Sequence, residues 1–395
     1  MEDQTVSNRH HAIDQSTLVT HDPHDDKHQG AVVMPIYQNS LFTFPTYKDF
    51  DQAFAGPDDT PLYSRGNNPT VQQLEARLAA LQGGEKARCF GSGMAAISTG
   101  IMSLVRGGDH VICVDQAYGP TRELLGKFLS QYGVETTFVD GTSLEAIRSA
   151  AKANTKLIYL ESPTTLTIRL QDLRACAHFA KSIGAATMID NTWATPCYQN
   201  PFEFGIDLVA HSVSKYIGGH SDIVGGVLIG SAELINRINA NEYLLLGGIM
   251  TSQTASLVMR GLRTLPLRLE KLEQNGLTVA RYLESLPFIT RVNHPGLPSH
   301  PQHELAKRQM TGTSSLFSFE TNLTTEVMKI WADRLAYFRI GVSWGGFESL
   351  VTVGKLGPGY ESVQGSLVRL YVGLEKPQDL IADIRQASAE LLVNS

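Results

Sequence analysis

Lys215 is the residue whose type and setting most directly predict chemistry in this chain. It follows an apolar run, 206–210, that predicts a short buried strand, and it precedes the paired glycines 218–219. The hydroxyls of Ser212 and Ser214 stand just before it. A lysine at a strand end is placed to be a desolvated amine of lowered pKa, the state that attacks a carbonyl to form a Schiff base. An ordinary surface lysine is the alternative that this stretch alone leaves open.

Polar residues follow three other predicted strands. Tyr118, the hydroxyl-rich turn 161–165 and the run 190–192, which contains Asp190 and Thr192, each come after an apolar segment. In parallel sheets, ligands bind beyond the carboxyl ends of the strands. Each residue alone is explained as a cap or turn residue. Together they predict one site with an aromatic ring, hydroxyls, a carboxylate and an amine.

Two further features favour binding of anions. Gly91-Ser92-Gly93-Met94 opens a predicted helix, where free backbone N–H groups and a partial positive charge suit a phosphate. Without a Walker lysine this is not a nucleotide P-loop, and such a turn alone is more often tight helix packing. Arg369 lies in a mainly apolar strand, 366–373, and needs an anion, either a structural carboxylate or that of a ligand.

The elements that must position these residues alternate along the chain. Strands are predicted at 110–114, 156–160, 186–189 and 208–212, with helices at 69–82, 121–132 and 173–183. The alternation predicts an α/β fold with a mainly parallel sheet covered by helices on both faces. Beyond it we expect helical segments at 239–267 and 274–286, strands at 289–292, 314–320 and 365–372, and a closing helix at 380–392.

This pattern divides the chain into three parts. We expect an N-terminal arm at 1–60, a large domain at 61–256 and a smaller α/β domain at 257–395. The apolar, aromatic segment 31–44 lacks a helical period, which suggests packing on another subunit. Five histidines lie in the first 30 residues, but their spacing matches no metal motif, so we expect a mobile arm and no metal site. They are His10, His11, His21, His24 and His28.

Composition narrows the class of partner. The chain has 395 residues, 42% hydrophobic and 18% charged, with a formal net charge of -6. Such a chain offers no basic field for nucleic acid or an anionic membrane, so a small-molecule partner is favoured. The four cysteines are widely spaced without CxxC pairing, which indicates free thiols in a reducing compartment. With no membrane span or leader pattern, we expect a cytoplasmic protein.

The predicted parts match what is needed to hold pyridoxal phosphate. Asp190 would keep the pyridine nitrogen protonated, and Tyr118 would stack on the ring. Ser212 and Ser214 would help the glycine turn to bind the phosphate, and Arg369 would grip a substrate carboxylate. Once the amino acid displaces Lys215, the freed amine can remove the α proton, and a group on the β carbon is then lost.

In these motifs the sequence resembles the pyridoxal-phosphate enzymes of cysteine and methionine metabolism. The resemblance runs from about residue 17 to the C-terminus. Its motifs are Pro35-Ile-Tyr-Gln, Tyr63-Ser-Arg65, Gly91-Ser-Gly-Met94, Glu161-Ser-Pro, Asp190-Asn-Thr, Ser214-Lys215-Tyr, Gly219-His-Ser-Asp222, Arg260-Gly-Leu-Arg-Thr and Arg369. It implies the aminotransferase-like fold of type I, with Lys215 as the Schiff-base lysine.

The resemblance also implies a shared active site. Tyr63 and Arg65 would reach the phosphate of a neighbouring subunit, which demands at least a dimer, and the family is usually a tetramer of two such dimers. The expected cofactor-binding residues are Tyr63, Arg65, Gly93, Met94, Tyr118, Asp190, Thr192, Ser212, Ser214 and Lys215. The expected substrate-binding residues are Ser343, Trp344 and Arg369.

Three positions bear on the reaction. Trp344, in Ser343-Trp344-Gly-Gly, and Thr165, where γ-enzymes tend to have Asn, both resemble the bacterial cystathionine β-lyase branch. Val342 departs from the tyrosine that the best-known β-lyases place there, which weighs against this branch, and we expect it to alter the distal substrate pocket. The favoured function is β-elimination from cystathionine or a related cysteine S-conjugate, giving a thiol, pyruvate and ammonia. Tyr118, or Tyr63 of the next subunit, would assist proton transfer.

Two alternatives stay open at this point. One is γ-elimination or γ-replacement, as in cystathionine γ-lyase or γ-synthase. The other, of a different class, is a regulatory protein that binds the cofactor without turnover, although the complete set of site residues weighs against it. The sequence does not choose between methionine synthesis, thiol release and a specialised pathway.

Overall fold

The larger sheet has seven strands. The structure is a computed structural model that describes residues 13–21, 28–56, 60–354 and 365–393. The strands are β1 (Lys86–Phe90), β2 (His110–Val114), β3 (Glu135–Val139), β4 (Thr155–Glu161), β5 (Ala186–Asp190), β6 (Leu208–His211) and β7 (Gly226–Gly230). Their order is β1-β7-β6-β5-β4-β2-β3. Strand β7 is antiparallel to β1 and β6, and all other neighbours are parallel, as predicted.

Both faces of this sheet are covered. On β7, Leu228 packs into one apolar cluster while Val227 and Ile229 pack into another, as the alternation of side chains along a strand requires. The first cluster includes α4 (Gly93–Leu104), α7 (Leu173–Ser182) and α9 (Ala232–Ile238). The second includes α3 (Pro69–Gln82), α11 (Ser252–Leu262) and the start of α12 (Leu265–Glu284). The predicted two-sided α/β layering is therefore confirmed.

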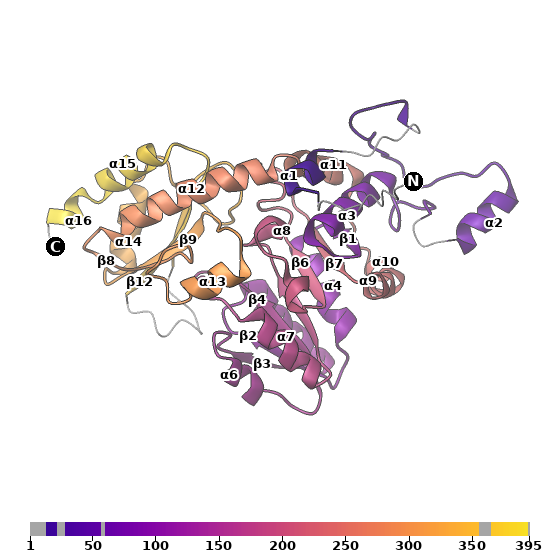
Figure 1. Ribbon diagram of the computed structural model, residues 1–395, viewed down its shortest axis with the longest axis horizontal. Coiled ribbons are helices and arrows are strands. Elements are labelled where there is room, and N and C mark those ends of the chain that lie inside the picture. Colours follow the sequence, from indigo (N-terminus) through magenta and orange to yellow (C-terminus); the bar gives the residue numbers. More distant parts are fainter. Residues whose placement is uncertain (1–12, 22–27, 57–59, 355–364, 394–395) are drawn as a thin grey trace, which may run out of the picture.

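A second sheet lies toward the C-terminus (Figure 1). It has the order β10-β11-β12-β9-β8 and is mainly antiparallel. Its strands are β8 (Ile289–Asn293), β9 (Leu316–Thr321), β10 (Arg339–Ile340), β11 (Leu350–Gly354) and β12 (Ser366–Tyr371). Helices α12, α14 (Thr325–Asp333) and α15 (Pro377–Ala387) bury its third apolar cluster. The predicted domain boundary at 256 lies within α11. The division of the chain into an arm and two domains stays a prediction.

Short elements complete the chain. They are α5 (Gly119–Glu123), a π-helix (Leu124–Phe128), a 3-10 helix (Leu129–Tyr132), α6 (Leu144–Ser149), α8 (Thr195–Tyr198), a 3-10 helix (Pro201–Phe204), a π-helix (Asn239–Tyr243), α10 (Leu244–Leu246), α13 (His303–Gln309) and α16 (Ala389–Val393). The predicted helix 121–132 is thus wrong as one α-helix. The continuous helix 239–267 is also wrong, because Gly247 turns left-handed at φ 69° and separates α10 from α11.

The helix α3 shows why some boundaries were predictable. The Asn68 side chain accepts a hydrogen bond from Thr70 N at 3.0 Å, Pro69 occupies the first turn, and Gly83 ends the helix at φ 78°. The edge strand β3, half exposed, and the glycine-flanked β7 carry weaker signals and were missed. At Gly226 a Cβ would lie 2.3 Å from the carbonyl oxygen of Ser92, so β7 requires glycine where it passes the start of α4.

The N-terminal region holds α1 (Gln15–Thr20), which packs on α3, and α2 (Tyr47–Ala55), which stands apart from the body in Figure 1. Helix α2 has no buried residue. Residues 1–12 and 22–27 of the predicted arm, with His10, His11 and His24, lie outside the described residues. Within the described ranges, no group of three or more His, Cys, Asp or Glu residues could hold a metal. No described helix is both long and apolar enough to cross a membrane.

Candidate active site

Lys215 lies just beyond the end of β6, in contact with residues of the C-terminal region. Its Nζ donates a hydrogen bond to Ser343 Oγ and lies 5.4 Å from the centre of the Trp344 ring. Trp344 in turn packs on the buried Tyr216, with ring centres 5.2 Å apart. The fold therefore brings Ser343 and Trp344, which are over 120 residues away along the chain, against the predicted nucleophile.

The environment of Lys215 makes the neutral amine easier to form than it is for a lysine in water. Burial is the larger cause and the charge of Arg369 the next, and together they lower the pKa of Lys215 to about 8, against an opposing effect of Asp190. A neutral amine is the form that attacks a carbonyl or accepts a proton.

Asp190 ends β5 and is oriented by a short chain of hydrogen bonds. Its Oδ1 accepts from Thr192 N at 2.9 Å and from Thr192 Oγ1 at 2.5 Å, and Thr192 Oγ1 accepts from Ser212 N at 2.8 Å. This leaves Oδ2 for another donor. Burial raises the pKa of Asp190, so its charge is disfavoured without a cationic partner. A protonated pyridine nitrogen would be such a partner.

The start of α4 approaches the lysine loop closely. Ser92 caps the helix by accepting from Ala95 N at 3.0 Å, and the first-turn N–H groups have no partner within a helix. A Cβ on Gly93 would lie 2.8 Å from Ser212 Cβ, so glycine is required for the helix start to meet Ser212. Gly93, Met94 and Ser212 thus form a cradle in which backbone N–H groups and a hydroxyl fit a phosphate.

Ser214 is placed differently from Ser212. Its hydroxyl accepts from Gly225 N at 2.9 Å and lies 3.2 Å from Gly225 O, to which it donates. Both bonds tie the lysine loop to the segment that leads into β7. These contacts assign the Ser214 side chain a role in loop structure, and its predicted contact with the phosphate stays a prediction.

Arg369 reaches the same site from the smaller sheet. It lies on β12, and its Nη2 donates to Ser343 O at 3.3 Å. Burial lowers the pKa of Arg369, while Tyr118 opposes this effect, which shows that Tyr118 lies within electrostatic reach. Ser343 has a left-handed backbone, φ 74°. A guanidinium disfavoured by burial fits a ligand carboxylate as its anion.

Lys215, Asp190, Ser212, Ser343 and Arg369, with Trp344, form what we call the site cluster. Among the described residues, no hydrogen bond or ion pair joins Tyr63 or Arg65 to it. The Arg65 guanidinium lies 5.6 Å from the centre of the Tyr63 ring, and that ring is 52% exposed. Their predicted role toward a neighbouring subunit stays a prediction.

Sequence reasoning missed a buried amide network behind the site. Gln199 Nε2 donates to Ser162 O and to Asn191 Oδ1, both at 2.8 Å, and His211 Nε2 is 2.6 Å from Gln82 Oε1. The network joins the ends of β4, β5 and β6. The only available signal was uncharged polar residues inside apolar runs. Sequence reasoning also treated Glu161 as part of a turn, whereas its carboxyl accepts from Tyr118 N at 2.7 Å.

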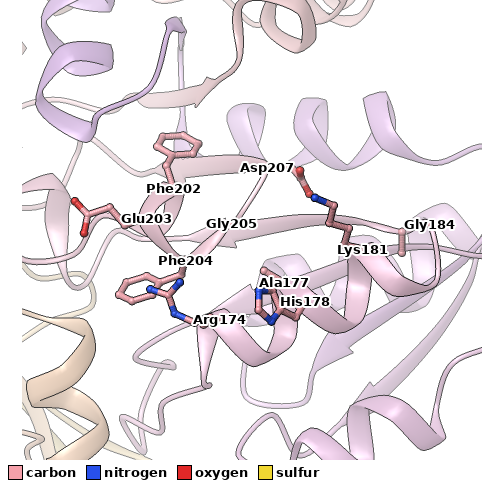
Figure 2. Close-up of a pocket in the computed structure, with 11 residues that line it drawn as sticks. Arg174, Ala177, His178, Lys181, Gly184, Phe202, Glu203, Phe204, Gly205 and Asp207 are labelled. Carbon is pink, nitrogen blue, oxygen red and sulfur yellow. The ribbon is translucent and has the colours of Figure 1, made fainter.

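A pocket of about 510 Å³ lies elsewhere, between α7 and residues 202–207 (Figure 2). It contains none of the predicted site residues. Arg174, whose guanidinium lies 5.3 Å from the centre of the Phe204 ring, lines it together with His178 and Lys181. These side chains are exposed, so the pocket offers no desolvated group for catalysis.

Residues 15–389 match the model of the Cys/Met metabolism PLP-dependent enzymes. The chain belongs to this family. Its fold is accordingly the pyridoxal-phosphate fold of type I, and its cofactor is pyridoxal 5′-phosphate, which the cradle at Gly93, the carboxylate of Asp190 and the amine of Lys215 fit.

Curated relatives of this Cys/Met metabolism enzyme carry several names. L-Methionine gamma-lyase of Pseudomonas putida is 37% identical over 377 residues, 93% of this chain and 94% of the relative. Cystathionine gamma-lyase of Bacillus subtilis (strain 168) is 40% identical over 92% of this chain and 95% of the relative. Cystathionine beta-lyase of Lactococcus lactis subsp. cremoris (strain MG1363) is 39% identical over the same shares. The similarity supports a carbon–sulfur lyase of the trans-sulfuration type without choosing between β and γ.

Proposed function

We propose that the protein catalyses β-elimination of cystathionine, or of a related cysteine S-conjugate, to a thiol, pyruvate and ammonia. The observation that carries the proposal is the position of Trp344 beside Lys215, in the Ser343-Trp344 turn that resembles the β-lyase branch. Val342, which precedes this turn, is apolar and 84% exposed, whereas γ-enzymes of the family usually carry an acidic residue before a Ser-Leu-Gly-Gly turn. Thr165, the other β-lyase-like residue, directs its hydroxyl to Glu161 at 2.7 Å.

Each residue of the site would have a separate role in the reaction. Pyridoxal phosphate, when bound, supplies the electron sink that acidifies Cα of the amino acid. Asp190 would hold the ring nitrogen of the bound cofactor, and Arg369 would bind the α-carboxylate of the substrate through its guanidinium, which would orient the Cα–H bond. Lys215, with its lowered pKa, takes the Cα proton onto Nζ.

The next step breaks the carbon–sulfur bond of the substrate. The bond from Cβ to sulfur breaks with its electron pair leaving on sulfur, and a proton from Lys215 or from the Tyr118 hydroxyl converts the leaving thiolate to a thiol. Water then hydrolyses the remaining three-carbon imine to pyruvate and ammonia. Only one C–H bond of the substrate needs to be broken, and Lys215 is in place for it.

Cystathionine itself tests the proposal, because it carries sulfur on the Cβ of one half and on the Cγ of the other. Purified holoenzyme should give homocysteine and pyruvate in equal amounts. Cysteine with 2-oxobutyrate as the main products would overturn β-elimination and would establish γ-elimination instead.

The second candidate is γ-elimination, favoured by the gamma-lyase names of two relatives at 37% and 40% identity. It requires a further proton removal at Cβ before the Cγ–S bond breaks. The half-exposed Tyr118 and Lys215 are the groups available for that extra step.

We also propose a homotetramer built as a dimer of dimers, in which Tyr63 and Arg65 bind the phosphate of the neighbouring subunit. The support is that, among the described residues, neither side chain hydrogen-bonds to the site residues of its own chain, and that Tyr47 and Phe54 of α2 are largely exposed. Large exposed aromatic groups indicate an interaction surface. The four cysteines are buried free thiols, which supports a reducing, cytoplasmic setting.

A further inference from the structure

Glu161 is a buried carboxyl directly beside Asp190. It is the last residue of β4 and pairs in register with Asp190, the last residue of β5, so both side chains leave the same face of the sheet. Glu161 is only 6% exposed. Burial first and the charge of Asp190 second raise the pKa of Glu161 to about 8. A second carboxyl at this position is therefore costly unless hydrogen bonds hold it.

Three hydrogen bonds hold the Glu161 carboxyl, and they come from two different loops. Oε2 accepts from Tyr118 N at 2.7 Å, in the loop after β2. Oε1 accepts from Thr165 N at 2.6 Å and from Thr165 Oγ1 at 2.7 Å, in the loop after β4. The two backbone N–H groups can only donate, so each oxygen of the carboxyl accepts at least one hydrogen bond. One side chain thus joins two loops at the site.

The hydrogen bond from the backbone nitrogen of Tyr118 to Glu161 restrains the position of the Tyr118 ring. Tyr118 stands at the N-terminal cap of α5, and its side chain makes no capping bond there. The ring is 44% exposed and lies within electrostatic reach of Arg369. Because the ring itself is only half packed, its position depends on the backbone that Glu161 holds.

The bond to Thr165 fixes a strained turn. Leu166 and Ile168 adopt left-handed backbone conformations, φ 68° and 55°, which side chains with a Cβ disfavour, β-branched isoleucine most. Such conformations persist only where surrounding contacts hold them. Glu161 holds the turn at Thr165, and Ser318 of β9 holds it again by donating to Leu166 O at 2.5 Å.

We propose that Glu161 is a positioning residue whose carboxyl group locks Tyr118 and Thr165 around the cofactor ring that Asp190 binds. Glu161 itself touches no reacting atom. The inference depends on the pyridoxal phosphate site and not on which carbon–sulfur bond is broken, so a failure of the β-elimination proposal leaves it intact.

Glu161→Gln tests the proposal, because an amide nitrogen cannot accept the hydrogen bond that a carboxyl oxygen accepts. We expect the affinity of the apoenzyme for pyridoxal phosphate to fall about tenfold. The visible circular dichroism of the bound cofactor should also change, since this signal reports the asymmetry of the ring's surroundings. An unchanged affinity and an unchanged dichroic band would overturn the proposal.

Glu273 offers a matched control. It lies on α12, and its Oε1 also accepts from the N and Oγ1 of one threonine, Thr313, at 2.7 and 2.9 Å. Among the described residues, Glu273 has no hydrogen bond to Lys215, Asp190 or Arg369. Glu273→Gln should lower the melting temperature without altering cofactor affinity or the dichroic band. If both glutamine variants changed the dichroic band and the affinity equally, Glu161 would be a general structural residue and the proposal would fail.

A double-mutant cycle with Tyr118→Ala separates positioning from general stability. If Glu161 acts through Tyr118, the effect of Glu161→Gln on cofactor affinity should shrink in the Tyr118→Ala background. Full additivity would contradict the proposal. Should Glu161→Gln not fold, Thr165→Val removes one of the three bonds. This variant should weaken cofactor affinity about threefold and change the dichroic band. If both the affinity and the band were unchanged, the proposal would be contradicted.

Discussion

The carboxyl edge of the seven-stranded sheet and the N-terminal region carry predicted site residues in opposite physical states. At the edge, Lys215 and Asp190 are held by hydrogen bonds to Ser343 and Thr192. In the N-terminal region, Tyr63 is half exposed, and α2 buries none of its residues. One chain is sufficient to organise the first region. We infer that the second is organised only when another chain covers it, so the two regions should respond differently to substitution.

Lys215→Ala should produce the largest effect. The variant loses the amine that takes the Cα proton, and we expect the rate of pyruvate formation to fall by at least about a thousandfold. A coupled assay of pyruvate measures this, with the melting temperature as a check on folding. Retention of lyase activity by Lys215→Ala would remove the catalytic role of the edge entirely.

Arg369→Met should lower kcat/KM by about a hundredfold, because the substrate carboxylate loses its charge-assisted hydrogen bonds. The matched variant Arg369→Lys keeps the charge but not the planar fork, so we expect an intermediate loss. Steady-state kinetics with cystathionine measure both. If the methionine and lysine variants behaved like the unaltered enzyme, Arg369 would be a structural residue of β12.

Arg65→Ala tests the second region. We expect about tenfold weaker binding of pyridoxal phosphate, because a charge-assisted contact to its phosphate is lost. At a cofactor concentration low enough to leave Arg65→Ala chains largely without pyridoxal phosphate, mixing them with inactive Lys215→Ala chains should restore up to about a quarter of the activity, since half of the dimers are hybrids with one complete site.

The mixing experiment has a clear contrary outcome. Subunits must first be exchanged under mild dissociating conditions, and size-exclusion chromatography should then show the tetramer again. If Arg65→Ala binds the cofactor poorly and no activity returns in hybrids, Arg65 acts within its own chain, and the proposed sharing of the site is wrong.

The pH dependence of the rate tests the electrostatics around Lys215, and we expect the rate to change by a few fold. Because the pKa of Lys215 is lowered to about 8, the neutral amine increases as pH rises toward and past 8, and kcat should rise with it. Arg369 is one cause of the lowered pKa of Lys215. In Arg369→Met this pKa should therefore rise, and the rising part of the pH–rate profile should move to higher pH. A shift of the profile to lower pH would contradict the electrostatic effect of Arg369 on Lys215.

Ser214→Ala should have the smallest effect. Its hydroxyl bonds only the backbone of Gly225 among the described residues, so we expect a loss of about 1 kcal/mol in the free energy of unfolding and unchanged cofactor affinity. Ser212→Ala, by contrast, should weaken cofactor binding. Equal effects of the two alanine variants on cofactor affinity would show that both serines contact the phosphate.

The sequence supported much of the fold and of the site, for identifiable reasons. Strand ends followed by Asp190 or Lys215 could be recognised because apolar runs stop where polar chemistry begins. The amide network around Gln199 and the role of Glu161 could not, because they depend on which distant loops meet. The break at Gly247 was missed because the leucines on either side keep a helical appearance.

The most direct test of the central claim compares S-methylcysteine with methionine. Both release methanethiol, but the sulfur of S-methylcysteine is on Cβ and that of methionine is on Cγ. The account predicts pyruvate, methanethiol and ammonia in equal amounts from S-methylcysteine and no 2-oxobutyrate from methionine at the same enzyme concentration. Rapid formation of 2-oxobutyrate from methionine, with S-methylcysteine left intact, would contradict it.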